Sequence, residues 1–203
     1  MSRLSKIELS PGFLAMLCAY FYFDPAETFF PFCLSVLLHE AGHLLCLRAL
    51  CAPIYRIRIS CCGAVICTDP LPYRRELMAA ASGPCMNLAL LLLCLRRYPL
   101  TALINFGLLT YNLLPLYPLD GGRMLRAALH LLLHDGAAAA AERWIAALCM
   151  ADLGGCAVYA ACVLHLGLWP VVVFALLLVR IAGTVVPKES FSRFAVDKSH
   201  PAC

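Results

Sequence analysis

Two histidines four residues apart, with a glutamate directly after the first, interrupt an apolar stretch of the 203-residue sequence. In His39-Glu40-Ala41-Gly42-His43, this spacing puts both imidazoles on one face of a helix, one turn apart. Two such rings can bind one Zn²⁺ ion, and Glu40 is placed to act as general base on a water at that metal. Ionisable residues inside membrane segments are costly and usually functional, so we predict a metal site rather than a satisfied pair of core histidines.

A catalytic zinc needs a third protein ligand and one open position. Asp120 is the candidate that stands out, because it lies in the segment NLLPLYPLDGG at 112–122, where two prolines interrupt a helix and two glycines allow close backbone approach. Unwound backbone with a carboxylate at membrane depth is where membrane proteins build sites. The alternative is an ordinary polar turn between two helices.

The composition indicates a protein whose main solvent is lipid. Apolar residues make up 63% of the chain and charged residues only 14%, against about 45–50% and 25% in average globular proteins. These values exclude both an ordinary soluble domain and a disordered chain. The formal net charge of +4 is too small and too scattered to indicate a nucleic-acid partner.

We therefore expect an all-α membrane protein, a polytopic bundle of about six transmembrane helices with a small β-hairpin between helices two and three. Residues 1–186 would form a single transmembrane domain, and 187–203 a polar cytoplasmic tail. The hairpin is predicted at 54–68, around Gly63, and the fourth helix is expected to break near Pro115 and Pro118. The helices are predicted near 13–23, 28–50, 76–95, 101–133, 142–166 and 168–185.

The distribution of basic residues predicts the orientation in the membrane. With a cytoplasmic N-terminus, nine basic residues fall in inside segments and only Arg96 and Arg97 fall outside. Six spans would then return the C-terminus to the cytoplasm. The nine inside residues are Arg3, Lys6, Arg56, Arg58, Arg74, Arg75, Lys188, Arg193 and Lys198.

These motifs resemble those of the site-2 proteases, the intramembrane zinc metalloproteases of peptidase family M50. The resemblance rests on HEAGH at 39–43, SGPCMN at 82–87 and NLLPLYPLDGG at 112–122, in the same order and in three successive hydrophobic segments. It is closest to the compact branch that includes the stage IV sporulation protein FB, without that protein's CBS domain. The resemblance implies one zinc ion bound by His39, His43 and Asp120, with Glu40 as the catalytic residue.

The resemblance also suggests which residues handle the substrate. It implies that Asn87 and Asn112 lie near the active site and hold substrate or the oxyanion, although an asparagine on an apolar helix can also simply bond to a neighbouring helix. An exposed strand edge could hold an unwound substrate by β-augmentation, and the alternative is a surface cap without substrate contact. The strand positions expected to pair with substrate are Ile57, Ile59, Gly63 and Val65.

We expect an intramembrane zinc metalloendopeptidase in a bacterial cell membrane that cleaves a membrane-embedded or membrane-tethered protein, such as a pro-sigma or anti-sigma factor. Its expected partners are this substrate and the lipid bilayer, with no nucleic acid and with an inhibitory membrane partner left open. One alternative is a membrane metal-binding protein or transporter that uses the same ligands, but transport does not need Glu40 beside the first histidine. Another is an inactive binding scaffold, which the complete set of His39, His43, Glu40 and Asp120 disfavours.

Overall fold

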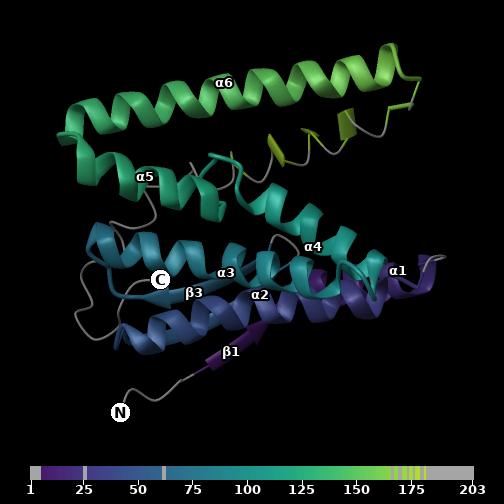
Figure 1. Ribbon diagram of the computed structural model, residues 1–203, viewed down its shortest axis with the longest axis horizontal. Coiled ribbons are helices and arrows are strands. Elements are labelled where there is room, and N and C mark those ends of the chain that lie inside the picture. The colour runs from purple at the N-terminus through teal and green to yellow at the C-terminus, as the bar shows by residue number, and fades with distance from the viewer. Residues whose placement is uncertain are drawn as a thin grey trace.

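The computed structural model describes residues 6–24, 27–60 and 63–165, together with 167–168, 171–172, 174–175, 177–178 and 181. Within these residues the chain is mainly helical and carries one small sheet (Figure 1). The helices are α1 (Pro11–Phe23), α2 (Phe29–Ala49), α3 (Tyr73–Cys94), α4 (Pro99–Asn112), α5 (Asp120–Leu132) and α6 (Asp135–Cys162). The strands are β1 (Lys6–Leu9), β2 (Ile54–Ser60) and β3 (Gly63–Thr68).

The start of α2 is fixed by the side chain of Asp24. The backbone N–H of Phe29 donates to Asp24 Oδ2 at 2.6 Å, and the Thr28 hydroxyl donates to Asp24 Oδ1 at 2.8 Å. The first N–H groups of a helix have no partner within the helix, so a carboxylate at this position stabilises the first turn of α2.

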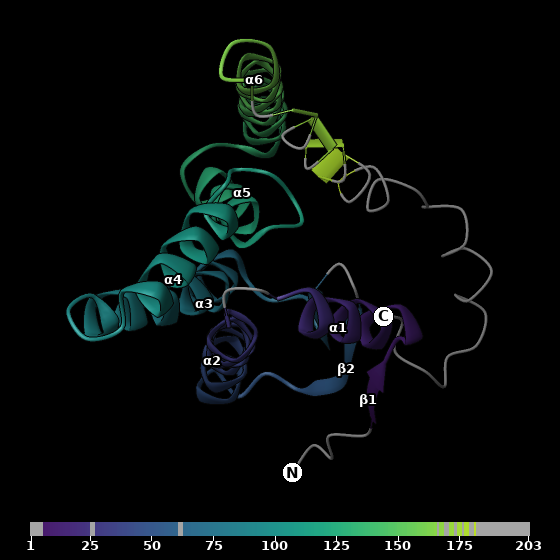
Figure 2. The same cartoon turned by 90° about the vertical axis from the view of Figure 1, so that its right-hand side faces the viewer.

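Helix α3 lies at the centre of the helical layer, in contact with α2, α4 and α5, and α6 lies beyond α5 (Figures 1 and 2). Small residues allow α2 and α3 to approach closely. A Cβ atom added at Gly42 would lie 2.6 Å from Met86 Cγ and 2.8 Å from the Ser82 carbonyl oxygen. Close approach at small residues is typical of helix packing in membranes, where lipid supplies no hydrophobic drive for association.

The sheet has the order β1-β2-β3, with β1 parallel to β2 and β2 antiparallel to β3. The predicted hairpin between the second and third helices is confirmed as β2 and β3. The parallel strand β1 was not predicted and makes β2 the central strand. A buried cluster of Leu47, Ile54, Ile57 and Ala79 packs this sheet against α2 and α3.

Among the described residues, three helices are long and apolar enough to cross a membrane, namely α2, α3 and α6, so six spans are not confirmed. A span needs about 20 residues, whereas α1, α4 and α5 have 13, 14 and 13. The predicted break near Pro115 and Pro118 is confirmed, since α4 and α5 are separate helices. Helix α6 begins earlier than the expected residue 142. Much of the predicted helix at 168–185, and all of 187–203, lies outside the described residues.

Candidate metal centre

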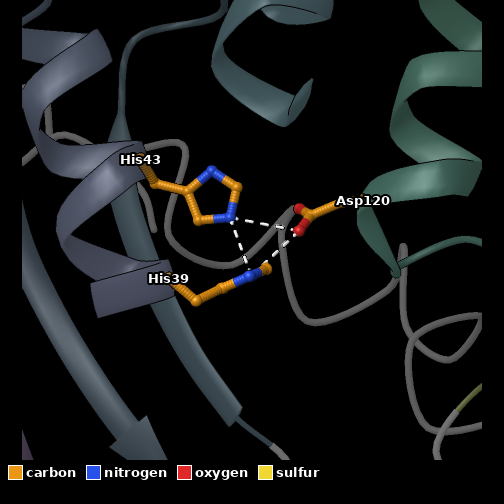
Figure 3. Close-up of side chains that lie close together, drawn as sticks. All are labelled: His39, His43 and Asp120. Carbon is orange, nitrogen blue, oxygen red and sulfur yellow. Dashed lines mark hydrogen bonds and ion pairs between the residues drawn. The ribbon is translucent and has the colours of Figure 1, made fainter. Parts of the chain in front are cut away.

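Three buried side chains from two helices converge on one point (Figure 3). His39 and His43 come from α2, and Asp120 is the first residue of α5. Asp120 Oδ2 lies 3.1 Å from Nε2 of His39 and 3.1 Å from Nε2 of His43, and the two Nε2 atoms are 3.2 Å apart. The sequence prediction that these three residues share one site therefore matches their placement, although they are separated by up to 81 residues in the chain.

The spacing of these three atoms fits a tetrahedral zinc site. Ligand atoms about 2.0–2.1 Å from a tetrahedral ion are about 3.3–3.4 Å from one another, which is close to the observed separations. Two imidazole nitrogens and one carboxylate oxygen are also the ligand types that Zn²⁺ prefers. Three protein ligands are the number expected at a catalytic zinc, because the fourth position must admit water or substrate.

The backbone of α3 fixes the protonation of His43. Nδ1 of His43 lies 2.8 Å from the carbonyl oxygen of Ala79. A carbonyl only accepts hydrogen bonds, so Nδ1 carries a proton, and a neutral His43 ring then keeps the lone pair of Nε2 for a metal. A metal-binding histidine commonly donates its other N–H to a carbonyl in this way.

Asn87 on α3 contacts the ring of His39. The amide nitrogen of Asn87 lies 3.0 Å from His39 Nδ1, and its amide oxygen has no hydrogen-bond partner among the described residues. If the amide is turned by half a turn, that oxygen faces Nδ1 and can accept a hydrogen bond from the ring N–H, which leaves Nε2 free for a metal. Asn87 has an exposed fraction of 0%, so in this structure its side chain is positioned to contact the His39 ring and not a substrate.

The metal centre leaves no room for a side chain at Gly83 on α3. A Cβ atom there would overlap Nε2 of His43 and would lie 2.7 Å from Cε1 of His39. The absence of this atom lets both rings lie directly over the backbone of α3. The glycine in the 82–87 segment is therefore explained by the space that the two histidines occupy.

Asp120 is held by the unwound segment before it and by charged residues around it. A Cβ atom at Gly121 would overlap the carbonyl of Leu113, so only glycine lets the start of α5 lie against the end of α4. Asp120 is buried, and its Oδ2 lies 3.1 Å from Nε2 of both histidines. A carboxylate must be ionised to serve as a metal ligand.

Arg123 contacts Asp120 and Glu76 contacts Arg123, and neither residue was singled out from the sequence. Arg123 Nη1 lies 3.4 Å from Asp120 Oδ1, and Arg123 Nη2 lies 2.9 Å from Glu76 Oε1 on α3. Only the spacing of three residues between Asp120 and Arg123 on one helix could have signalled the first contact. Glu76 is 47 residues away from Arg123, and no local pattern joins the two.

The other predicted site residues lie in different settings. Glu40 follows His39 on α2 and is half-buried, and its role as the base stays a prediction. Asn112 donates to the carbonyl of Leu108 in its own helix at 3.0 Å, and among the described residues its hydrogen bonds do not reach the ligands. Ile57 and Ile59 lie on the central strand, paired on one side with β1 and on the other with β3.

The positions on β3, Gly63 and Val65, belong to an edge strand of the described sheet. Ile57 pairs with Ile7 of β1, so β1 would have to leave before a substrate strand could take its place along β2. Pairing at Gly63 and Val65 needs no such rearrangement. The substrate-pairing prediction is untested at all four positions, and this arrangement favours the two on β3.

Comparisons with known proteins agree with this site. Residues 95–152, which contain Asp120 but not the two histidines, match the model of peptidase family M50. A zinc metalloprotease of Methanocaldococcus jannaschii is 34% identical over 108 residues, which cover 47% of this chain and 32% of the relative. The chain thus spans about a third of that relative's length.

A solved structure shares the fold. The site-2 protease from Methanocaldococcus jannaschii superposes with a TM-score of 0.56 at 23% sequence identity, covering 86% of this chain and 88% of that chain. The three matches together confirm the resemblance to the site-2 protease family that the motifs at 39–43, 82–87 and 112–122 indicated.

Proposed function

We propose that this membrane protein is a zinc metalloendopeptidase of the site-2 protease type, which cleaves a membrane-embedded or membrane-tethered protein. The observation that carries the proposal is the convergence of His39, His43 and Asp120 within 3.2 Å, with Glu40 beside the first histidine. The matches to family M50 and to an archaeal zinc metalloprotease support the same chemistry.

In this proposal His39 Nε2, His43 Nε2 and Asp120 Oδ2 hold one zinc ion. When bound, zinc supplies a Lewis acid that polarises the scissile carbonyl and makes a water molecule more acidic. The protein's part in metal binding is to present three ligand atoms whose protonation is already set, which lowers the cost of assembling the site.

Glu40 acts as general base and then as general acid. It follows His39 on the same turn of α2 and is half-buried, so its carboxylate can accept a proton from the attacking water. The same carboxyl group then donates that proton to the leaving amine nitrogen. Removing this group while leaving the three ligands in place should therefore stop turnover and spare metal binding.

The substrate must enter as an extended chain, because the hydrogen bonds of a helix shield its peptide groups. Each backbone hydrogen bond lost in an apolar setting is costly, and pairing with a strand edge replaces several at once. We propose that β3, an edge strand of the described sheet, supplies this pairing at Gly63 and Val65. Asn112, half-buried at the end of α4, is the proposed polar contact for the unwound substrate or the oxyanion.

The proposed setting is a cell membrane with the sheet on the cytoplasmic side, as the basic residues at 56, 58, 74 and 75 predict. The proposed substrates are membrane-bound regulators, a class that includes pro-sigma and anti-sigma factors. Cleavage of such proteins inside the membrane would release a soluble fragment.

Metal removal tests the proposal. The protein, purified in detergent or vesicles, should cleave a model membrane-helix substrate, lose activity with a chelator and recover it when Zn²⁺ is added back. The matched controls are the His43→Ala and Asp120→Ala variants, which should bind little zinc and stay inactive after zinc addition. Cleavage that persists at full rate after all bound metal has been removed would overturn the proposal.

A further inference from the structure

We propose that Arg123 and Glu76 are positioning residues for Asp120, which hold its carboxylate so that one oxygen alone faces the two histidines. This inference rests on the proposed function only in taking the three ligands as a zinc site. It assigns a role to two charged residues that the cleavage mechanism does not use.

The two oxygens of Asp120 have separate partners. Oδ2 faces Nε2 of both histidines at 3.1 Å, and Oδ1 faces Nη1 of Arg123 at 3.4 Å. The Arg123 contact therefore turns Oδ1 away from the histidines. When Asp120 contributes a single oxygen, the three protein ligands leave the fourth position of a tetrahedral site open for water or substrate, as a catalytic site needs.

Arg123 is itself held by α3. Its Nε and Nη2 atoms both lie 2.9 Å from Oε1 of Glu76, and the two side chains are about two-thirds buried, with exposed fractions of 31% and 28%. The planar guanidinium of Arg123 makes two contacts to Glu76 and one to Asp120. This rigid geometry can fix the Asp120 carboxylate in a way that a lysine ammonium cannot. Without Arg123, the carboxylates of Glu76 and Asp120 would face each other with no positive charge between them.

The first turns of α3 thereby support two ligands at once. Glu76 acts on Asp120 through Arg123, and the carbonyl of Ala79, one turn later, accepts the hydrogen bond of His43 Nδ1. The third ligand, His39, is contacted by Asn87 of the same helix. Helix α3 contributes none of the three ligands, yet it contacts all of them. The contacts to His39 and His43 are direct, whereas the contact to Asp120 passes through the side chain of Arg123.

The test measures zinc affinity by competition with a chelating dye. Loss of a group that orients a metal ligand typically weakens metal binding by about 10–100-fold. We expect this loss for Arg123→Ala, a smaller loss for Arg123→Lys and Glu76→Gln, and no further loss when Glu76→Gln is added to Arg123→Ala. The visible spectrum of the Co²⁺-substituted protein should also change in Arg123→Ala, because Asp120 can then offer both oxygens.

Arg126→Ala is the matched control, since Arg126 lies one turn further along α5 and its 3.9 Å ion pair with Glu142 is away from the ligands. It should bind zinc as the wild type does. If Arg123→Ala does not purify as folded protein, Glu76→Gln gives the same comparison with an almost unchanged side-chain shape. Wild-type affinity in both Arg123→Ala and Glu76→Gln would overturn the inference alone, whereas a wild-type protein without zinc affinity would overturn the proposed function as well.

Discussion

The side-chain amide of Asn87 lies 3.0 Å from Nδ1 of His39, while Nε2 of the same ring faces Asp120 at 3.1 Å. The imidazole is thus held between a neutral amide on one edge and a carboxylate on the other. The motif resemblance associates Asn87 with substrate, but in the structure Asn87 contacts His39, a proposed metal ligand. Its first effect should therefore be on metal binding.

Replacing Asn87 by leucine should weaken zinc binding by about 10–100-fold, because His39 Nδ1 loses its partner and the ring its orientation. Leucine keeps nearly the same volume, so the packing of α3 against α2 should change little. The affinity is measured by dye competition on the purified variant. An Asn87→Leu protein with unchanged zinc affinity but lower cleavage would instead favour the substrate role.

Asn105 on α4 provides a contrasting case, because its partner Ser35 lies on α2 one turn before His39. Its amide donates to Ser35 Oγ at 2.8 Å and to the carbonyl of Thr101 at 2.9 Å, and its exposed fraction is 0%. Asn105→Leu removes both hydrogen bonds, including the one that joins α4 to α2, and a typical hydrogen bond contributes about 0.5–1.5 kcal/mol. We expect lower thermal stability with unchanged zinc affinity. Reduced zinc affinity here would mean that the two buried asparagines act as one network.

Sequence reasoning succeeded where residue type and local spacing carry the chemistry. His39 and His43 were predicted to share a site because four residues make about one helical turn, and Asp120 because prolines and glycines mark unwound backbone. It missed the contact of Ala79, since a backbone carbonyl has no side-chain signal. It missed β1 as well, because four residues give little periodicity and pair with a strand that begins about 50 residues later. Hydropathy predicted six helices, but it does not measure where a helix ends, and three of those described are too short to span.

Gly83→Ala should abolish zinc binding without unfolding the protein. The added methyl group would overlap the His43 ring and press on His39, so the two Nε2 atoms could not both face Asp120. Gly107→Ala is the control on α4, because no atom lies within 4 Å of a Cβ at that position. Bound zinc is counted by elemental analysis of both variants. Stoichiometric zinc in Gly83→Ala would show that the rings do not lie where the structure has them.

A proline scan along β3 should separate folding from substrate pairing. Along β3, successive backbone N–H groups point alternately toward β2 and away from it. Proline at one set of positions therefore removes a hydrogen bond to β2, and proline at the other set removes an N–H that faces away from β2. We expect proline at the second set of positions, between Ala64 and Cys67, to keep zinc and stability and to lose cleavage. The readouts are melting temperature, zinc content and cleavage rate. Full cleavage by every stably folded variant would exclude pairing at this edge.

The proposed orientation in the membrane places the segment around Val65 and the segment around Arg97 on opposite sides of the membrane. Reporter fusions near Val65 should give the cytoplasmic signal, and fusions near Arg97 the external one, because basic residues concentrate on the side of the sheet. An external signal at Val65 would invert the proposed topology. It would also place the substrate strand on the opposite face of the membrane.

The most direct test of the central claim compares wild type with Glu40→Gln at equal zinc content. The substitution keeps the shape of the side chain and removes the proton acceptor, while His39, His43 and Asp120 stay in place. The account predicts wild-type zinc stoichiometry in Glu40→Gln and a cleavage rate of a membrane-helix substrate lower by at least about 10²-fold, the lower end of typical general acid–base contributions. Cleavage at the wild-type rate by zinc-loaded Glu40→Gln would contradict it.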